Sequence, residues 1–581
     1  MDSTRWIELC EARGDVAVKP EFIKNLSDAA IHSESYQPWI QLTGAKVEPP
    51  SKRHKAATGQ NRNRQANIRH IKEAQASQIC SGLARTGECS KENCPYSHDL
   101  KERRRLLGSA PAEVPFLGPR CPNFVERGVC REGVNCIFGL SHTDEDGFNI
   151  TQAGRRVTPL DLEALRKEQI NNIEQEITQR LRKNKYDWSL AKGVVTTVNS
   201  FVDSRGSDEP TPPKTLSLAN KLVLAPLTTV GNLPFRRLCV GFGADVTVSE
   251  MILAKALTRG SLSDMSLLKR HPCEKVFGVQ LAGGNAEEFA KATQFLKENA
   301  TMDFIDINAG CPLDALNRTG AGAALLTRPA RLERVVRSVV SISPVPVTIK
   351  MRNGFDDLKV SFGEEGCQYV AKSLQARLCS WGVSAIFHHG RTAKQRYTRQ
   401  CDWPYLHHCA LTIPSSVDYV ANGDLLNLHE YEREKDEAIQ GHMIGRGALI
   451  KPWIFQELKQ GKVWDISATE RFDVLKDYCK FGLDHWGYDK KGIQTTRRFL
   501  LEWLSFANRY VPVGILETHE AGPINKRPPP ICGRSELEEL MASPCSNDWV
   551  KLSERLLGRV EDGFTFLPKH KSHGCPTEES L

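Results

Sequence analysis

Residues 304–351 contain the pattern that decides the fold, FIDINAGCPLDALNRTGAGAALLTRPARLERVVRSVVSISPVPVTIKM. Short apolar runs begin and end this stretch, at 304–309 and 345–351, and a helix's length of sequence lies between them. Two buried strands joined in this way indicate a parallel pair, because a parallel connection needs a crossover of a dozen or more residues. The same alternation recurs on both sides of the stretch.

Eight such runs follow Thr215 within about 230 residues, at 221–227, 244–251, 276–282, 304–309, 345–351, 385–389, 418–421 and 442–444. Eight alternating β/α units predict a TIM (β/α)8 barrel, and an open doubly wound sheet is the alternative. The ends of the runs favour the barrel, because a barrel builds its active face at the C-terminal ends of its strands. Polar residues or glycine stand there, namely Gln280, Asn308, Lys350, His389, Asn422 and Gly445.

The composition excludes several classes of protein. The chain has 581 residues, of which 40% are hydrophobic and 25% charged, as expected for a soluble protein of three or four domains. No run approaches the roughly 18–20 apolar residues of a membrane span, and the first residues lack a secretory signal. We therefore expect no membrane association and a location in the cytoplasm, the nucleus or both. The 18 cysteines then indicate metal or catalytic chemistry, and the net charge of +8 permits a nucleic-acid partner without requiring one.

The N-terminal third of the chain is more polar. Residues 51–72 contain seven Lys or Arg and no Asp or Glu, which predicts a disordered arm that seeks phosphates, or else a linker or localisation signal. Apolar residues between Leu162 and Leu181 recur at helical spacing, and residues 203–213 have the composition of a linker.

The strand pattern stops after Trp453. Ser467-Ala-Thr-Glu470 is a capping-box signal for a helix, and a second helix is predicted to begin at Arg497. We predict six parts: a basic, disordered N-terminal region (1–75), two zinc fingers (76–145), a helix and linker (146–214), the barrel (215–450), a helical domain (451–568) and a tail (569–581).

Two cysteine-dense blocks have the spacing of zinc ligands. The first is Cys80, Cys89, Cys94 and His98, and the second is Cys121, Cys130, Cys136 and His142. Three thiolates and one imidazole at short separations suit tetrahedral zinc, which replaces a hydrophobic core in so small a unit. The blocks resemble Cys-Cys-Cys-His fingers that bind RNA. His142 stands two residues further from its last cysteine than His98 does, so its ligand role is the less secure.

Cys311 stands two residues after the 304–309 run and is followed by proline. A cysteine on the active face of a barrel can act as a nucleophile or a general acid. The nearby Thr319-Gly-Ala-Gly-Ala-Ala324 looks like a phosphate loop, but it does not directly follow a strand.

A series of motifs covers the whole predicted barrel in order: Leu-Ala-Pro-Leu at 224–227, Pro-Phe-Arg-Arg at 234–237, Glu-Met at 250–251, Asn-Ala-Gly-Cys-Pro at 308–312, His-Gly-Arg-Thr at 389–392, Asn-Gly-Asp at 422–424 and Gly-Arg-Gly-Ala at 445–448. In these motifs residues 220–568 resemble the tRNA-dihydrouridine synthases. The two preceding blocks point to the eukaryotic, zinc-finger-bearing branch of that family.

The resemblance implies FMN as the cofactor and assigns its contacts. Cys311 would be the proton donor. The flavin would pack against Ala225, Pro226 and Leu227, where many relatives have Met at the third position. Its ring system or ribityl chain would contact Gln280, Lys350 and His389, and its phosphate side would be held by Asn422, Gly423, Asp424, Gly445 and Arg446.

The resemblance also implies a reaction, the reduction of uridine to 5,6-dihydrouridine in tRNA. NADPH or NADH reduces FMN, the flavin N5 delivers hydride to carbon 6 of uracil, and the thiol of Cys311 protonates carbon 5. Lys350 would stabilise the negative charge of the reduced flavin, and Asn308 would hydrogen-bond the uracil. The zinc-finger branch points to position 47, in the variable loop.

The expected partner is therefore tRNA, with mRNA as a further possible substrate and no obligate protein partner. Phosphate contacts are predicted from residues 51–72, from 101–105, and from Arg497, Arg498 and Arg509. Two alternatives remain open: a small-molecule flavin ene-reductase, and a zinc-finger RNA-binding protein without activity.

Overall fold

The computed structural model describes residues 6–8, 10, 16–24, 78–109, 114–167, 169–204, 211–357, 360–361, 367–397, 399–518 and 528–569. The predicted basic arm at 51–72 lies outside these residues. The chain divides into two compact units. The first comprises Met1–Ala17, Gln169–Asp465 and Tyr510–Arg527, and the second comprises Val18–Glu168, Ile466–Arg509 and Pro528–Leu581.

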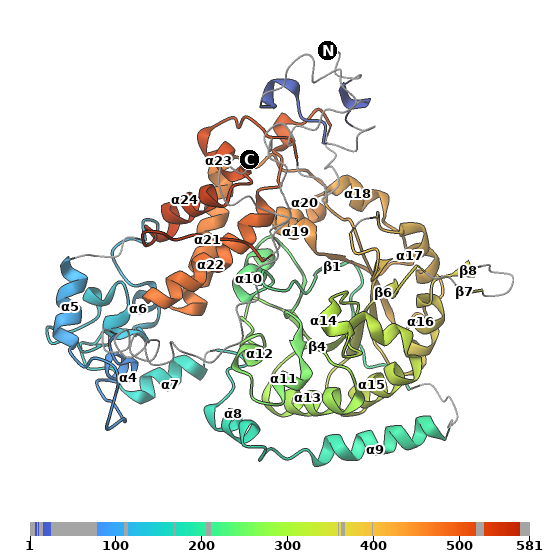
Figure 1. The fold of residues 1–581 in the computed structure, drawn as a ribbon, viewed down its shortest axis with the longest axis horizontal. Helices are drawn as coiled ribbons and strands as arrows, with labels where there is room; N and C mark the ends of the chain where they lie inside the picture. The colour runs from blue at the N-terminus through green and yellow to red at the C-terminus, as the bar shows by residue number, and fades with distance from the viewer. Residues whose placement is uncertain are drawn as a thin grey trace, which may run out of the picture. The chain divides into compact units, whose positions relative to one another are not determined.

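Eight parallel strands of the first unit close into a barrel (Figure 1). They are β1 (Lys221–Leu224), β2 (Val246–Val248), β4 (Val276–Ala282), β5 (Phe304–Ala309), β6 (Val347–Gly354), β9 (Ala385–Thr392), β10 (Asp418–Asn422) and β11 (Gly441–Ile444). Their order is β2-β1-β11-β10-β9-β6-β5-β4, and pairing of β2 with β4 closes the ring. The predicted TIM barrel is thus confirmed, and closure excludes the open doubly wound sheet.

Helices follow most strands and cover the outside of the barrel (Figure 1). They are α10 (Leu233–Gly241), α11 (Ala254–Leu257), α12 (Leu262–Ser266), α13 (Ala286–Asn299), α14 (Asp314–Asn317), η4 (Gly322–Thr327), α15 (Pro329–Ile342), α16 (Ala371–Ser380), α17 (Trp403–Ala410), α18 (Leu428–Arg433), α19 (Arg446–Ile450) and α20 (Ile454–Gln460). A two-residue strand β3 (Ile252–Leu253) extends the sheet beside β4, and β7 (Val360–Ser361) with β8 (Cys367–Gln368) forms a small hairpin. Phe304 and Phe387 meet inside the barrel with their ring centroids 6.0 Å apart.

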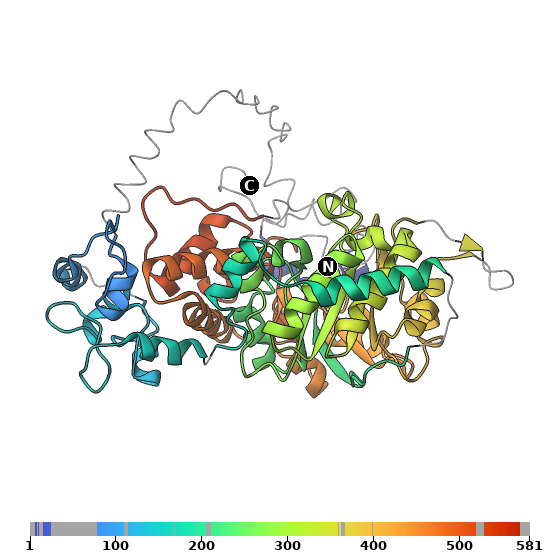
Figure 2. The same cartoon turned by 90° about the horizontal axis from the view of Figure 1, so that it is seen from below.

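The single helix predicted between Leu162 and Leu181 is wrong. The structure has two helices there, α7 (Pro159–Lys167) and α8 (Gln175–Arg182), and they belong to different units. Asn171 causes the interruption, since it adopts a φ of 63° and its side chain bonds the backbone of Leu268 and Thr301. The 15-residue helix α9 (Ser189–Asp203) then packs on α13 and α15, as Figure 2 shows.

The second unit contains α4 (Ser81–Thr86), α5 (Leu100–Ser109), α6 (Pro122–Arg127), η2 (Gly133–Asn135), η3 (Gly139–Ser141), α7, α21 (Ala468–Trp486), α22 (Lys490–Ala507), α23 (Glu536–Ala542) and α24 (Ser546–Leu557). The capping box of Ser467 and Glu470 is present at the start of α21, as predicted. The second helix begins seven residues before Arg497, because Asp489 caps it by accepting a hydrogen bond from the backbone N–H of Gly492. In the described part of the chain no helix is both long and apolar enough to span a membrane.

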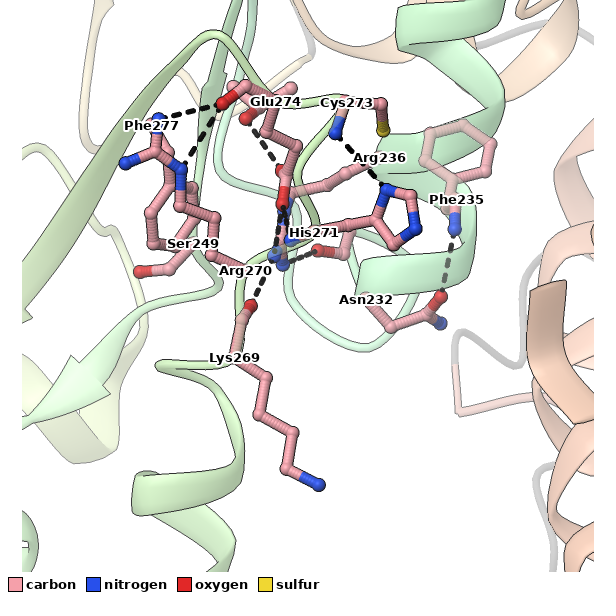
Figure 3. A network of polar contacts seen from close by, with 12 residues as sticks. Asn232, Phe235, Arg236, Ser249, Lys269, Arg270, His271, Cys273, Glu274 and Phe277 are labelled. Atoms are coloured by element: carbon pink, nitrogen blue, oxygen red, sulfur yellow. Dashed lines mark hydrogen bonds and ion pairs between the residues drawn. The ribbon is translucent and has the colours of Figure 1, made fainter. Parts of the chain in front are cut away.

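A buried ion pair between Arg236 and Glu274 joins α10 to the segment before β4 (Figure 3). Arg236 donates from Nε to Glu274 Oε1 at 2.7 Å and from a terminal nitrogen to the carbonyl oxygen of Lys269 at 2.7 Å. Glu274 also accepts from the hydroxyl of Thr247 and the backbone N–H of His271. Burial favours the neutral form of Glu274, but the charge and hydrogen bonds of Arg236 outweigh it and hold its pKa below the ordinary value.

We expect Glu274→Gln to destabilise the protein by about 3–5 kcal/mol, because it leaves the buried Arg236 charge unpaired. Since the pKa of Glu274 is lowered by folding, this stabilisation is present at neutral pH and is lost as pH falls through the folded pKa. Denaturant unfolding at pH 7 measures the loss. The matched control is Glu287→Gln, which breaks an exposed pair with Lys291 and should change stability by less than about 1 kcal/mol. Equal effects of the two substitutions would contradict the assignment.

Candidate active site

The residues predicted at the strand ends face one another in the sheet ladder. Asn308 of β5 lies opposite Lys350 of β6, and His389 of β9 lies opposite Asn422 of β10. Parallel strands bring their C-terminal ends to the same face of a barrel, which is why residues that are distant in sequence meet here.

A chain of buried polar groups leads to the backbone of Cys311. Gln280 Nε2 donates to Asp306 Oδ2 at 2.7 Å, and Asn308 Nδ2 donates to Gln280 Oε1 at 2.8 Å. Asn308 Oδ1 in turn accepts from the N–H of Cys311 at 3.0 Å. Asp306 also accepts from the Thr348 hydroxyl at 2.7 Å, and burial raises its pKa to about 6 despite these hydrogen bonds. The network holds the start of the Cys311 loop in one position.

Both polar ends of the Gln280 amide therefore have partners inside the protein. Asp306 is a member of this network for which the sequence motifs predict no role. The sequence does contain a signal for this role, because Asp306 is a carboxylate within an apolar strand. It stands two residues before Asn308, and alternate residues of a strand point to the same side.

The Cys311 side chain is partly exposed, and burial raises the pKa of its thiol above the ordinary value. The thiol is therefore protonated at neutral pH. Gly322 lies behind it with a φ of 62°, and a Cβ there would approach the Cys311 carbonyl oxygen to 2.8 Å. The N–H of Ala323 donates to that same oxygen at 3.1 Å. The glycine-rich run 319–324, which resembles a phosphate loop, thus supports the cysteine loop in this structure.

Positive charge gathers beside the cysteine. Lys350 Nζ donates to Asn422 Oδ1 at 3.2 Å, and burial, together with the neighbouring Arg352, lowers its pKa to about 8. Arg352 was missed by sequence analysis although it follows Lys350 at the two-residue spacing of one strand face. Its side chain is buried and donates to the carbonyl oxygens of Gly310 at 2.8 Å and Thr392 at 2.9 Å. It thereby joins the cysteine loop to the end of β9.

His389 faces this group of cations as a neutral imidazole. Burial and the charges of Arg352, Lys350, Arg391 and Arg446 together hold its pKa well below the ordinary value. An Arg391 nitrogen approaches His389 Nε2 at 3.2 Å. Because a guanidinium nitrogen always carries hydrogen, Arg391 is the donor, and Nε2 of the neutral His389 is the acceptor.

Asp424, which follows β10, bridges Arg391 at the end of β9 and Arg446 after β11. Asp424 accepts from a terminal nitrogen of Arg446 at 2.6 Å, pairs with Arg391, and accepts from the N–H of Cys401 at 2.8 Å. The Tyr397 ring lies under Arg446, with the guanidinium carbon 4.0 Å from its centroid. Gly423 adopts a φ of 151°, and a Cβ there would lie 2.2 Å from the Cys401 sulfur. Cys401 fills the space beside Gly423, and Arg391 has partners within the protein for each of its nitrogens, so Arg446 is the guanidinium suited to a phosphate here.

The segment after β1 completes this face. The N–H of Ala225 donates to the Ile444 carbonyl at 2.9 Å, which places Ala225, Pro226 and Leu227 next to the β11 end. A Cβ on Gly445 would lie 3.6 Å from Ala225 Cβ and 3.7 Å from Leu227 Cδ2. The structure therefore brings the predicted cofactor residues into one region around Cys311.

Both predicted metal clusters form. In each block the four candidate ligand atoms lie within 4.8 Å of one another: Cys80, Cys89, Cys94 and His98 in the first, and Cys121, Cys130, Cys136 and His142 in the second. The sulfurs of Cys80 and Cys89 are 3.6 Å apart, and those of Cys121 and Cys136 are 3.8 Å apart. Zinc–sulfur bonds of about 2.3 Å in a tetrahedron require sulfurs about 3.8 Å apart.

His142 belongs to the second cluster in spite of its longer spacing. The 3-10 turn η3 takes up the extra residues and returns the histidine to the three cysteines. His142 is fully buried, and neither ring nitrogen has a hydrogen-bond partner. A buried imidazole without a partner is costly, and a bound metal ion removes that cost.

The prediction that Arg497 contacts phosphate is wrong. Its side chain is buried and donates to the Ser553 hydroxyl and to the carbonyls of Leu557 and Gly558 at the end of α24. Arg498 is exposed and Arg509 is partly buried. In α5, Lys101 pairs with Asp146 and Arg105 with Glu102, so both of these cations already have a carboxylate partner.

Comparisons with known proteins agree with this geometry. The family model described as Dihydrouridine synthase (Dus) matches residues 223–500. The chain is 39% identical to the mouse tRNA-dihydrouridine(47) synthase [NAD(P)(+)]-like protein over 570 residues, which cover 89% of this chain and 86% of that one. It is 38% identical to the human protein of the same name, over 89% of this chain and 84% of that one. It is 36% identical to tRNA-dihydrouridine(47) synthase [NAD(P)(+)] of Coprinopsis cinerea, over 84% of this chain and 81% of that one.

Among solved structures, morphinone reductase aligns with 13% identity and a TM-score of 0.30, over 44% of this chain and 91% of that one. The barrel itself follows from the strand pairing. With this strand order, a half-exposed cysteine after β5 and relatives similar along most of the chain, the protein belongs to the dihydrouridine synthase family and is an oxidoreductase.

Proposed function

We propose that this tRNA-dihydrouridine synthase reduces uridine 47 in the variable loop of tRNA, with FMN as its cofactor and NADPH or NADH as its reductant. The observation that carries the proposal is the protonated thiol of Cys311 on the active face, beside Lys350 and Arg352. A thiol that is protonated at neutral pH can serve as a general acid. The names of the similar proteins support tRNA, position 47 and NAD(P) as the substrate, site and reductant.

The residues of the barrel face fit FMN. Arg446, which Asp424 holds in place, would bind the phosphate beside Asn422, Gly423 and Gly445 at the ends of β10 and β11. The Ala225-Pro226-Leu227 segment offers an apolar surface for the ring system. When bound, FMN supplies the hydride that reduces the uracil double bond.

The protein's own groups then perform two tasks. The Cys311 thiol gives its proton to carbon 5 of the uracil, and the side-chain oxygen Oδ1 of Asn308 fixes the loop that carries this thiol. Lys350 and Arg352 place positive charge where negative charge develops during the transfer. The target base must leave its stack to reach this face, so the enzyme has to hold the surrounding RNA firmly.

We also propose that each cysteine–histidine cluster binds one zinc ion, since three thiols and an imidazole at tetrahedral separations match its preferred ligands. We expect two zinc ions per chain by elemental analysis, and one after His142→Ala followed by dialysis against a mild chelator. His408→Ala, an exposed histidine of the barrel, should retain both. Two retained ions in His142→Ala would remove that residue from the ligand set.

The function is tested with purified protein, NADPH and unmodified tRNA. We expect a flavin absorption spectrum, and dihydrouridine mapped at position 47 alone. Oxidation of NADPH by small enones with tRNA unchanged would favour an ene-reductase, and a colourless protein that binds RNA would favour a non-catalytic role. A uridine-containing mRNA fragment supplied in parallel tests whether mRNA is also a substrate. We also propose that the protein is located in the cytoplasm, the nucleus or both, which microscopy of the tagged protein tests.

A further inference from the structure

The two cysteine–histidine fingers form one body. Ala84 of the first finger packs against Gly133 of the second so closely that a Cβ on Gly133 would lie 1.8 Å from the Ala84 carbonyl oxygen. Asn149 donates to the carbonyls of both Arg85 and Cys130. Leu107 of α5 and Val134 complete a common apolar core with Ala84. The fingers therefore have a fixed orientation relative to each other.

The second finger packs on the loop between α21 and α22, which is more than 340 residues away in sequence. The N–H of Ile137 donates to the Tyr488 carbonyl at 2.9 Å, and Cys136 forms an antiparallel bridge with Asp489. The Phe138 and Tyr488 rings lie 6.3 Å apart, and both are buried. Figure 1 shows α6 next to these two helices, and Glu126 of α6 pairs with Lys480 of α21.

Charged groups strengthen this contact. Arg131 donates to the His485 carbonyl at 3.3 Å and pairs with the buried Glu132 at 2.8 Å. Glu132 also pairs with Arg85 of the first finger. Gly487 adopts a φ of 114°, and a Cβ there would lie 3.3 Å from the Glu132 carboxylate. The helical hairpin and the second finger are thus fitted closely to each other.

Equivalent positions of the two fingers differ in exposure. An aromatic residue stands two positions after the third cysteine in each, Tyr96 in the first finger and Phe138 in the second. Phe138 is buried against Tyr488, whereas Tyr96 is partly exposed. The same holds for the ligands, since all four of the second cluster are buried and His98 of the first is exposed.

We propose that the second finger is a structural clasp for the α21–α22 hairpin, and that the first finger alone faces RNA and stacks an unpaired base on Tyr96. Helix α5 follows the first finger directly and carries Lys101, Arg103, Arg104 and Arg105. Lys101 and Arg105 are paired with carboxylates, so Arg103 and Arg104 supply the charge for the neighbouring phosphates. The identity of the RNA as tRNA rests on the proposed function. The clasp rests on the contacts of Phe138, Arg131 and Tyr488 alone.

The matched pair Tyr96→Ala and Phe138→Ala in the full-length protein tests this division. Tyr96→Ala should weaken tRNA binding about tenfold, the loss expected for one base–aromatic stack, with an unchanged melting temperature. Phe138→Ala should lower the melting temperature of the unit that contains the fingers and the α21–α22 hairpin by about 5–10 °C. It should also speed amide hydrogen exchange in residues 484–492. Its tRNA affinity, measured well below that melting temperature, should stay within about twofold of wild type.

The proposal would be overturned if Tyr96→Ala lowered the melting temperature and left tRNA affinity unchanged while Phe138→Ala weakened tRNA binding at an unchanged melting temperature. Unchanged hydrogen exchange at 484–492 in Phe138→Ala would also overturn it. Should that variant fail to fold, Phe138→Leu keeps an apolar side chain and should give a smaller shift in the same direction. A wild-type protein that forms no dihydrouridine would contradict the proposed function, while the melting and exchange differences between the two variants would still decide the clasp.

Discussion

Replacing Cys311 by serine should lower the rate of dihydrouridine formation by about 10²- to 10⁴-fold, the contribution expected of a general acid. A serine hydroxyl is a far weaker acid than a thiol and cannot give its proton to carbon 5 at a useful rate. The loop that carries residue 311 should keep its position, because Asn308 and Ala323 hold it through the backbone N–H and carbonyl oxygen of that residue. Flavin content and the rate of flavin reduction by NADPH should therefore equal those of wild type. Single-turnover assays that separate the two half-reactions measure both rates.

Cys273→Ser is the matched control. Cys273 is also a half-buried, free cysteine with a raised pKa, but it lies in the segment before β4 and not in the Cys311 loop. Its substitution should leave both half-reactions unchanged. If Cys311→Ser retained more than a tenth of the wild-type rate of uridine reduction, the proton would have to come from another group.

The barrel could be predicted from sequence because its signal is local and repeated. Each strand is a short apolar run, and each C-terminal end carries a residue such as Lys350 or His389 that an apolar strand does not otherwise need. Closure of the ring by β2 and β4 is the step that periodicity alone did not settle.

Residues whose role depends on distant partners could not be predicted. The sequence around Arg497 is that of any basic helix, and its partners, the carbonyl oxygens of Leu557 and Gly558 at the end of α24, lie 60 and 61 positions later. Asn171 interrupts a helix because the backbone of Leu268 and Thr301 binds its side chain. Arg352 is an intermediate case: its spacing from Lys350 places both on one face, but its side chain donates to Gly310 in the loop after β5 and to Thr392 of β9.

The sequence predicts the fingers (76–145) and the helical domain (451–568) as separate parts, whereas one compact unit of the structure contains residues of both. The contacts responsible join residues near 136 to residues near 488, and the pattern of neither segment indicates the other. A spacing rule finds the zinc ligands, since they lie within about twenty residues. It does not find the surface on which the finger packs.

Lys350→Met should lower the rate of uridine reduction by about 10²- to 10³-fold, the cost of removing one preorganised electrostatic group from a buried site. The pH profile distinguishes a charge effect from a loss of packing. Burial and Arg352 lower the pKa of Lys350 to about 8, so its positive charge is present below that pH and is lost as pH rises through it. The wild-type rate should therefore fall above about pH 8. Cys311 ionises only at a higher pH, because burial raises the pKa of its thiol, so it is still a proton donor where Lys350 loses its charge.

Lys350→Arg separates these two groups, because a guanidinium keeps its charge throughout this range. Its rate should stay level through pH 8 and fall only at the higher pH where Cys311 ionises. Lys350→Met should be slow and should likewise show no step at pH 8. Lys291→Met, a lysine of α13 on the outside of the barrel, is the control and should reproduce the wild-type profile. A wild-type fall that persisted unchanged in Lys350→Arg would assign the titration near pH 8 to another group and would remove Lys350 as the source of the charge.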